Sequence, residues 1–391
     1  MVHDYAGHPF QVGLSRALAA RGHVVVHAYF AGDPGPKGAL APRGAADPVR
    51  FLPISIGRAY DKGAIVARQW ADVAYGRAAA RAVAGFRPDV VISGNTPTAA
   101  QAGVIRGCRA AGAAFVLWVQ DFYSLAVVRL LGRRLGPLGA VVGAAYRAME
   151  RWQFGASDGV VVITEDFRPL AEGWARAPVA TIENWGALDE IWPGPRDNGF
   201  AREFGLREGF NFVYSGTLGM KHDPSLLLGL AAAVRGRARV VVVGQGSGME
   251  RLAAAGAENL RLLPLQPVGR LREVLAAADV AVAVIEPDAG EFSVPSKVQS
   301  YLCAGRPVLL AAPAGNLAAR VVRAEAAGVV VEPGDAAGFA AAGCALLGDA
   351  AGRAEMGARG RRYAERAYDV GRVADRFEEV LVAAARRKGR R

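Results

Sequence analysis

Short apolar runs alternate along the whole chain with longer segments in which apolar residues recur at helical spacing. The runs are rich in valine and lie at residues 24–28, 90–92, 115–119, 160–163, 212–214, 240–243, 280–285, 308–310 and 329–331. Strands that are apolar throughout and alternate with helices form parallel sheets covered on both faces. The pattern therefore predicts an α/β protein built of βαβ units.

The length of the chain and one break in its composition predict two domains. At 391 residues the chain exceeds the size at which single hydrophobic cores stop growing. A run dense in proline and glycine at residues 192–199 precedes a fresh series of strands and helices. We expect one doubly wound, Rossmann-like domain over residues 1–192 and a second over 193–365, with a ligand cleft between them. Residues 366–391 predict a helix and basic tail that pack back on the first domain.

The chain begins abruptly. A helical pattern from Pro9 to Gly22 leads directly into the run at 24–28, so Val2-His3-Asp4 predicts only the stub of a preceding strand. A doubly wound domain normally opens on a full central strand. Either the true start lies upstream of Met1, which we favour, or this edge of the sheet is weakened.

The charge of the chain narrows the class of its partner. A net charge of +11 favours an anionic partner, which includes nucleic acid, acidic lipid and phosphorylated substrates. The sequence has no zinc finger, RNA-binding aromatic pattern or basic zipper, so we expect no nucleic-acid partner. Residues 386–391 form a basic cluster that either attracts an anionic membrane surface or serves as a solubilising end.

Cysteine usage and hydropathy predict a cytoplasmic protein. Cys108, Cys303 and Cys344 are widely separated, have no metal-ligand spacing and lie among apolar residues. No charge-free apolar run reaches the roughly 18 residues of a membrane span, and residues 1–4 lack the pattern of a secretion signal.

A lysine stands at a predicted helix start soon after the apolar run at 280–285. Ser296 and Lys297 occupy this start, and Gly305 follows the predicted helix. A helix N-terminus with a cation beside it binds phosphate, and open α/β folds place ligands at the carboxyl edge of the sheet. The alternative is an N-cap beside a solvated charge.

A series of short segments carries a family resemblance when the segments are taken in order. They are residues 18–24, 182–186, 214–221, 243–246, 278–280, 294–297 and 304–308. The series resembles glycosyltransferases of the GT-B fold, family 4, and within them the group that builds capsule, O-antigen or colanic-acid-type polysaccharides. The resemblance covers nearly the whole chain. It implies that a sugar moves from a nucleotide diphosphate sugar to an acceptor, with retention at the anomeric carbon.

The resemblance implies a donor site made mainly by the second domain. Lys221 follows a glycine-bearing turn, where close backbone approach and a cation suit a diphosphate; the alternative is an exposed loop lysine. Lys297 would be the second cation, with backbone N–H groups beside it stabilising the leaving group. The remaining residues of the implied donor site are Gly216, Thr217, Gly244, Gln266 near the base, Pro295 and Ser296.

Two departures from the family pattern bear on this site. The usual pair of glutamates seven residues apart is missing, because Ser300 stands in the second position and Phe292 in the first. Glu291 lies one place away and either reaches the sugar hydroxyls or is only a polar loop residue. The arginine that usually precedes the first lysine is absent as well, with Thr217 nearest its place.

The acceptor side of the site is expected in the first domain. Asp121 follows the strand at 115–119 and is the first candidate for orienting or deprotonating the acceptor hydroxyl; a helix N-cap is the alternative. Gly7 and His8 are expected under the donor phosphates. Asn95 and Thr96 are expected to line the acceptor side.

Cofactor and partner expectations follow from the same residues. No Asp-x-Asp triplet occurs in the sequence, so we expect transfer without a metal ion or other cofactor, the nucleotide diphosphate sugar being a co-substrate. The expected acceptor is a saccharide linked to polyprenyl diphosphate. A basic, apolar, helical stretch at residues 125–152 either rests on an anionic bilayer at the inner face of the cell membrane and receives this acceptor or packs in the core.

Two other functions fit the same scaffold. One is an epimerase or phosphorylase. The other is a nucleotide-sugar-binding regulatory subunit whose chemistry has decayed, which the missing glutamates permit.

Overall fold

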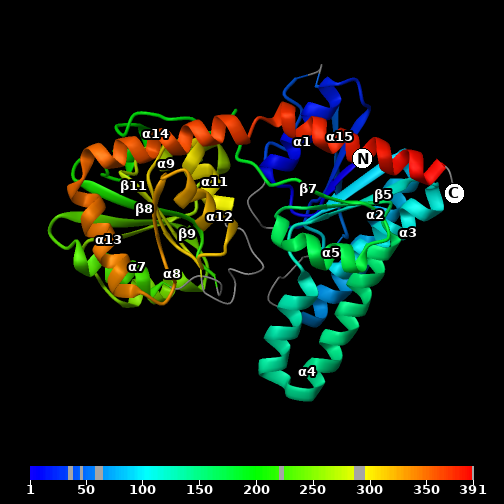
Figure 1. Cartoon of the computed structure of the whole chain (residues 1–391), viewed down its shortest axis with the longest axis horizontal. Coiled ribbons are helices and arrows are strands. Elements are labelled where there is room, and N and C mark those ends of the chain that lie inside the picture. Colours follow the sequence, from blue (N-terminus) through cyan, green and yellow to red (C-terminus); the bar gives the residue numbers. More distant parts are fainter. Residues whose placement is uncertain (34–37, 45–46, 58–64, 220–223, 286–295, 390–391) are drawn as a thin grey trace. The chain divides into compact units, whose positions relative to one another are not determined.

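The computed structural model describes residues 1–33, 38–44, 47–57, 65–219, 224–285 and 296–389. It contains two compact units, which are shown in Figure 1. The first unit comprises Met1–Asn184 together with Val370–Arg391, and the second comprises Trp185–Asp369. The chain therefore leaves the first unit once and returns to it with its last helix.

The proline- and glycine-rich run at 192–199 belongs to the second unit. The Arg272 guanidinium lies 4.0 Å from the centre of the Trp192 ring, and Arg306 donates a hydrogen bond to the Gly194 carbonyl at 2.8 Å. These contacts fasten the run to the second unit, so the division between the units falls earlier, after Asn184.

The first unit is built on a seven-stranded parallel sheet of order β3-β2-β1-β4-β5-β6-β7. Its strands are β1 Val2–Asp4, β2 Val25–Phe30, β3 Val49–Ile54, β4 Val90–Gly94, β5 Ala114–Val119, β6 Gly159–Val162 and β7 Val179–Thr181. The short strand β1 lies in the centre and pairs with β2 on one side and β4 on the other. Because β1, β4 and β5 are parallel neighbours, the residues that follow them lie at the same edge of the sheet.

The helices of the first unit cover the sheet and include one long projecting element. They are α1 Pro9–Ala20, α2 Ile65–Phe86, α3 Thr98–Ala111, α4 Tyr123–Ala156, the 3₁₀ turn η1 Glu165–Phe167, α5 Arg168–Trp174 and α15 Val370–Gly389. Helix α4 turns back on itself at Gly136, whose backbone is non-helical and which Pro137 follows. Its two arms lie side by side, because a Cβ at Gly143 would come within 2.6 Å of Val128 Cγ2. Figure 1 shows them as a helical hairpin that extends away from the sheet of this unit.

The second unit is built on a six-stranded parallel sheet of order β10-β9-β8-β11-β12-β13. Its strands are β8 Phe210–Thr217, β9 Ala238–Gln245, β10 Leu260–Pro264, β11 Val280–Val284, β12 Val308–Ala311 and β13 Gly328–Val331. Its helices are α6 Gly199–Glu203, α7 Ser225–Ala233, α8 Ser247–Ala254, the 3₁₀ turn η2 Val268–Arg270, α9 Leu271–Ala276, α11 Ser296–Cys303, α12 Leu317–Ala324, α13 Ala336–Gly348 and α14 Ala350–Ala367.

The predicted α/β class with two parallel, Rossmann-like sheets is confirmed. Each of the nine apolar runs lies in a strand, to within one residue at either end, while β3, β7 and β10 were not predicted. All three are edge strands, and each carries residues that are partly or fully exposed. An edge strand meets solvent along one side, so it need not carry the continuous apolar run that marks a buried parallel strand, although the fourth edge strand, β13, does carry one.

Candidate functional site

A cavity of roughly 340 Å³ lies in the first unit at the carboxyl ends of three central strands. Its lining includes Ala6 after β1, Asn95 after β4 and Asp121 after β5. Parallel strands end at one edge of their sheet, and ligands of open α/β folds bind outside that edge. We call this cavity the first-unit pocket.

The turn after β1 is held by the buried carboxylate of Asp4. Its oxygens accept hydrogen bonds from the backbone N–H of Ala6, at 3.2 Å, and of His8. The His8 imidazole Nδ1 lies 3.4 Å from the same carboxylate. Burial acts to raise the pKa of Asp4, but the hydrogen bonds and charge of His8 hold it below its ordinary value. Asp4 therefore stays ionised and fixes His8 at the rim of the pocket.

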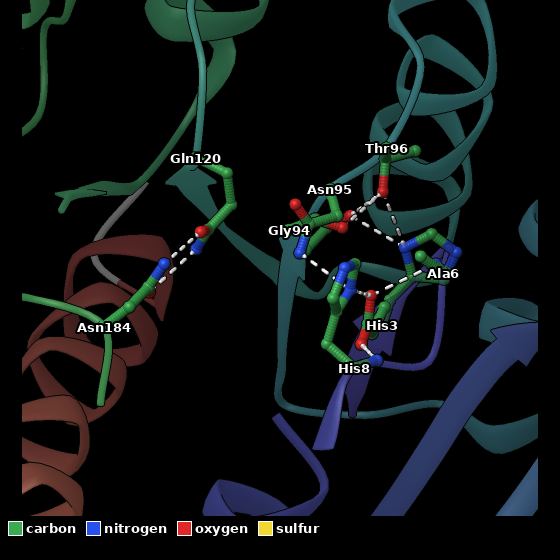
Figure 2. Close-up of polar contacts among 10 residues, drawn as sticks. His3, Ala6, His8, Gly94, Asn95, Thr96, Gln120 and Asn184 are labelled. Carbon is green, nitrogen blue, oxygen red and sulfur yellow. Dashed lines mark hydrogen bonds and ion pairs between the residues drawn. The ribbon is translucent and has the colours of Figure 1, made fainter. Parts of the chain in front are cut away.

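The loops after β1 and β4 meet at His8, as Figure 2 shows. Asn95 has a φ of 52°, in the left-handed region that asparagine tolerates better than most residues. Its side-chain amide lies 3.2 Å from His8 Nδ1. Gly7 adopts a φ of 74°, and its carbonyl accepts a hydrogen bond from Gly38, so Gly7 shapes the turn that presents His8.

A buried polar cluster lies beneath these loops. His3 Nδ1 is 2.7 Å from the Ser93 hydroxyl, and His3 Nε2 is 2.8 Å from the Tyr75 hydroxyl. Thr96 donates to the Gly94 carbonyl at 2.8 Å and lies 3.2 Å from Ser93 Oγ. Burial lowers the pKa of His3 to about 4, so its imidazole is neutral near pH 7. The cluster braces the loop that carries Asn95 and Thr96.

Asp121 lies at the pocket wall with an exposed side chain. The N-cap of α4 is Phe122 and not Asp121, so the helix-capping alternative for Asp121 is wrong. The buried Glu150 serves that helix end instead, because its carboxylate accepts hydrogen bonds from the N–H groups of Tyr123 and Ser124 and from the Ser124 hydroxyl. This arrangement leaves the Asp121 side chain at the pocket wall.

A reciprocal pair of amides joins the end of β5 to the last residues of this unit before the chain crosses over. Gln120 Nε2 donates to Asn184 Oδ1 at 3.2 Å, and Asn184 Nδ2 donates to Gln120 Oε1 at 2.5 Å. Figure 2 shows the pair apart from the His8 cluster. The contact fixes the segment in which Asp121 follows Gln120.

In the second unit, Lys297 lies at the start of α11 against the aromatic ring of Tyr214. Its ammonium is 3.9 Å from the ring centre and donates a hydrogen bond to the Tyr214 hydroxyl. That hydroxyl donates in turn to the Thr217 carbonyl at 2.8 Å. Burial lowers the pKa of Lys297 to about 7, so part of the lysine population is neutral near pH 7.

Two glycines bring the backbone close to this lysine. A Cβ at Gly216 would lie 3.7 Å from Lys297 Cε, and a Cβ at Gly244 would lie 2.3 Å from the Gly216 carbonyl oxygen. Gly216 has a φ of 125°. The ends of β8 and β9 are further tied by hydrogen bonds of Leu218 with the segment 245–248. Without these side chains, a phosphate can approach both the backbone and the cation.

Some of the other predicted donor residues lie in the described part of the second unit, and the rest lie outside it. Ser296 is exposed at the first position of α11, Ser300 lies one turn further on, and Thr217 is exposed at the end of β8. Gln266 lies beyond β10 at the same sheet edge, where Arg270 donates to its side-chain oxygen at 3.2 Å. Lys221, Glu291 and Pro295 lie outside the described residues.

Sequence reasoning missed Tyr214, Asp4 and His3 as supports of the site. A polar residue inside a short apolar strand was the available signal for Asp4 and His3. No such signal exists for Tyr214, because it lies 83 residues from Lys297 in the chain. Within the described ranges, no group of three or more His, Cys, Asp or Glu side chains is arranged to hold a metal ion.

Two protein-family models match the chain, one in each half. Residues 9–185 match the model of the glycosyl transferase 4-like domain, and residues 209–349 match that of the glycosyl transferases group 1. The chain is also 25% identical over 262 residues to a protein named probable glycosyltransferase WbjE from Pseudomonas aeruginosa. That match covers 64% of this chain and 64% of the relative, so it spans somewhat less than two thirds of the relative's length.

Solved structures share the fold over almost the whole chain. Anabaena HepE in complex with UDP and glucose superposes with a TM-score of 0.70 at 14% identity, covering 98% of each chain. Sucrose-phosphate synthase from Thermosynechococcus elongatus gives 0.69 at 16% identity and 97% of each chain. An E. coli protein described as trehalose-6-phosphate bound with UDP-2-fluoro glucose gives 0.67 at 13% identity, covering 97% of this chain and 98% of that one.

Proposed function

Since this chain is a glycosyltransferase of the GT-B type, we propose that it transfers a sugar from a nucleotide diphosphate sugar to a lipid-linked saccharide acceptor. The observation that carries the proposal is Lys297, which lies beside Gly216 at the carboxyl edge of the second sheet. A cation at the start of a helix suits a diphosphate that gains charge as it leaves.

The donor belongs to the class of nucleotide diphosphate sugars. Two structures of the same fold are described as holding UDP with glucose or UDP-2-fluoro glucose. In this chain the diphosphate would contact Lys297 and the N–H groups at the start of α11, with Lys221 as a second cation. Gln266 would lie towards the base.

The acceptor would occupy the pocket of the first unit. Asp121 would orient or deprotonate its hydroxyl as a general base, and His8, held by Asp4, would offer a further polar contact at the rim. The reaction would proceed with retention at the anomeric carbon, as the family resemblance implies. Lysine charge would replace a metal ion, so EDTA should leave the rate unchanged.

The acceptor we propose is a saccharide linked to polyprenyl diphosphate, used to build a capsule, O-antigen or related surface polysaccharide. Such an acceptor is anchored in a bilayer, so the enzyme would contact the cytoplasmic face of an anionic membrane. No helix in the ranges that the structure describes is long and apolar enough to cross a membrane.

A thermal-shift panel of nucleotide sugars, followed by turnover assays on lipid-linked acceptors, tests the proposal. The true donor raises the melting temperature by mass action. Lys297→Ala should abolish this shift, whereas Lys388→Ala, a lysine on the terminal helix, should retain it. Asp121→Asn should keep the shift and lose turnover by about 10²- to 10⁴-fold. Donor binding by the wild type without turnover on any acceptor would favour a nucleotide-sugar-binding subunit instead.

A further inference from the structure

Most of the large apolar side chains that are exposed to solvent gather on one element of the first unit. Among the described residues of both units, the exposed large apolar side chains are Val24, Trp70, Val141, Val142, Met149, Trp152 and Trp192. Four of these seven lie on the second arm of the α4 hairpin, the part of α4 after Gly136. Single exposed apolar residues need no explanation, but a cluster on one element marks an interaction surface.

The exposed residues form a stripe along this arm. Val141, Ala145, Met149 and Trp152 follow one another at spacings of four, four and three, and all are exposed. Residues at such spacing share one face of a helix. Val141 is 69% exposed and Trp152 is 36% exposed. Since they mark the two ends of the stripe, it runs for about 16 Å along the arm at 1.5 Å per residue. We call it the hairpin stripe.

Positive charge lies beside one end of the hairpin stripe. Arg151 directly precedes Trp152 and is exposed, and the Arg109 guanidinium lies 5.4 Å from the centre of the Trp152 ring. Arg147 is also exposed on this arm, but at 3.6 residues per turn it lies on the opposite side of the helix from Met149. Glu150 is the only acidic residue in the α4 sequence, and it is buried where it holds the start of the helix. The face is therefore complementary to an apolar surface with an anionic border.

The hairpin begins at the first-unit pocket. Tyr123, the first residue of α4, lines that pocket, and its ring lies 6.0 Å from the ring of Tyr146 on the second arm. Gln69 on α2 donates to the Tyr146 hydroxyl, which places the exposed Trp70 on the helix next to this arm. The element that carries the hairpin stripe thus also lines the pocket with its first residue.

We propose that the hairpin stripe is a docking surface for an anionic lipid bilayer, on which the α4 hairpin lies along the interface rather than crossing it. This inference rests on the proposed lipid-linked acceptor and names the surface through which it is met. The valine and methionine side chains would enter the region between headgroups and acyl chains. Trp152 would sit at headgroup level, and the arginines would pair with lipid phosphates.

Sedimentation with vesicles tests the proposal in the full-length protein. We expect binding to vesicles that contain phosphatidylglycerol and much weaker binding to pure phosphatidylcholine vesicles. The double substitution Val141→Ser with Trp152→Ser should lower the partition coefficient by about tenfold or more. Arg109→Gln with Arg151→Gln should lower it mainly at low salt. Val24→Ser, at an 83% exposed position of the same unit, is the matched control and should bind as the wild type does.

The outcomes separate this proposal from the proposed function. Equal binding by wild type and the Val141/Trp152 variant, or absence of wild-type binding, would overturn the docking surface. A wild-type dimer that the same variant abolishes, seen by analytical ultracentrifugation, would also overturn it by showing that a second copy covers the face. Turnover on a short-chain, water-soluble acceptor should survive the substitution. If the wild type shows no turnover on that acceptor, the transferase reaction is refuted. The vesicle-binding result would still stand, because it is measured without turnover.

Discussion

Donor affinity should fall as the pH rises above about 7, because Lys297 must carry a proton to bind a diphosphate. Burial lowers the pKa of this lysine to about 7, whereas its ordinary value is 10.5. Among the described residues of β8 and α11, the other titratable groups are Tyr214, Tyr301 and Cys303, and burial raises the pKa of all three, so they remain neutral. In the free enzyme the lysine therefore loses its charge just above neutral pH.

The size of the effect follows from linkage. A bound diphosphate holds the lysine protonated, so binding above the free pKa takes up one proton and the apparent Kd rises about tenfold per pH unit. Between pH 6.5 and 8.5 the expected weakening is roughly twentyfold, given a free pKa of about 7. Isothermal titration calorimetry with the intact donor measures both the Kd and, from buffers of different ionisation enthalpy, the proton uptake.

Lys297→Arg supplies the control for this pH dependence. Guanidinium stays protonated throughout the range, so the variant should bind with a Kd that does not change with pH, whatever its absolute affinity. A wild-type Kd that is the same at pH 6.5 and 8.5, or an arginine variant with the wild-type slope, would refute the reasoning.

The remaining predictions concern the stability of the first unit. Gly103→Ala should lower the free energy of unfolding by about 1–3 kcal/mol, since its Cβ would come within 2.4 Å of the Gly76 backbone where α2 and α3 cross. Urea titration measures this change. The control is Gly85→Ala, whose Cβ would have nothing within 4 Å and which should be neutral or stabilising. Burial lowers the pKa of His3 and His27 to about 4, so the unfolded chain binds more protons between about 6.5 and 4 and stability should be lost as the pH falls through that range. A melting temperature that is equal at pH 7 and pH 5, or a His27→Gln variant as acid-sensitive as the wild type, would contradict this.

Local pattern was sufficient for the buried part of the fold. A parallel strand covered on both faces must be apolar throughout, so runs such as 240–243 and 308–310 predict their strands directly. The same reasoning passes over β3, β7 and β10, whose open edges admit polar residues. The short strand expected at Val2–Asp4 is present, and it lies at the centre of the sheet and not at a weakened edge, because the number of residues in a strand does not reveal its place in the sheet.

The sequence by itself determined the α/β class, the series of motifs that resembles the glycosyltransferases, and the choice of Lys297 and Asp121 as candidates. Only the tertiary structure decided how these residues are held. Tyr214 braces Lys297 from 83 residues away, and Glu150 takes over the helix end beside Asp121 from 26 residues away. Hydrogen bonds of this kind depend on which strand ends meet at one sheet edge. The spacing of residues along the chain does not reveal which strand ends are neighbours, because the strand order is set when the whole sheet packs.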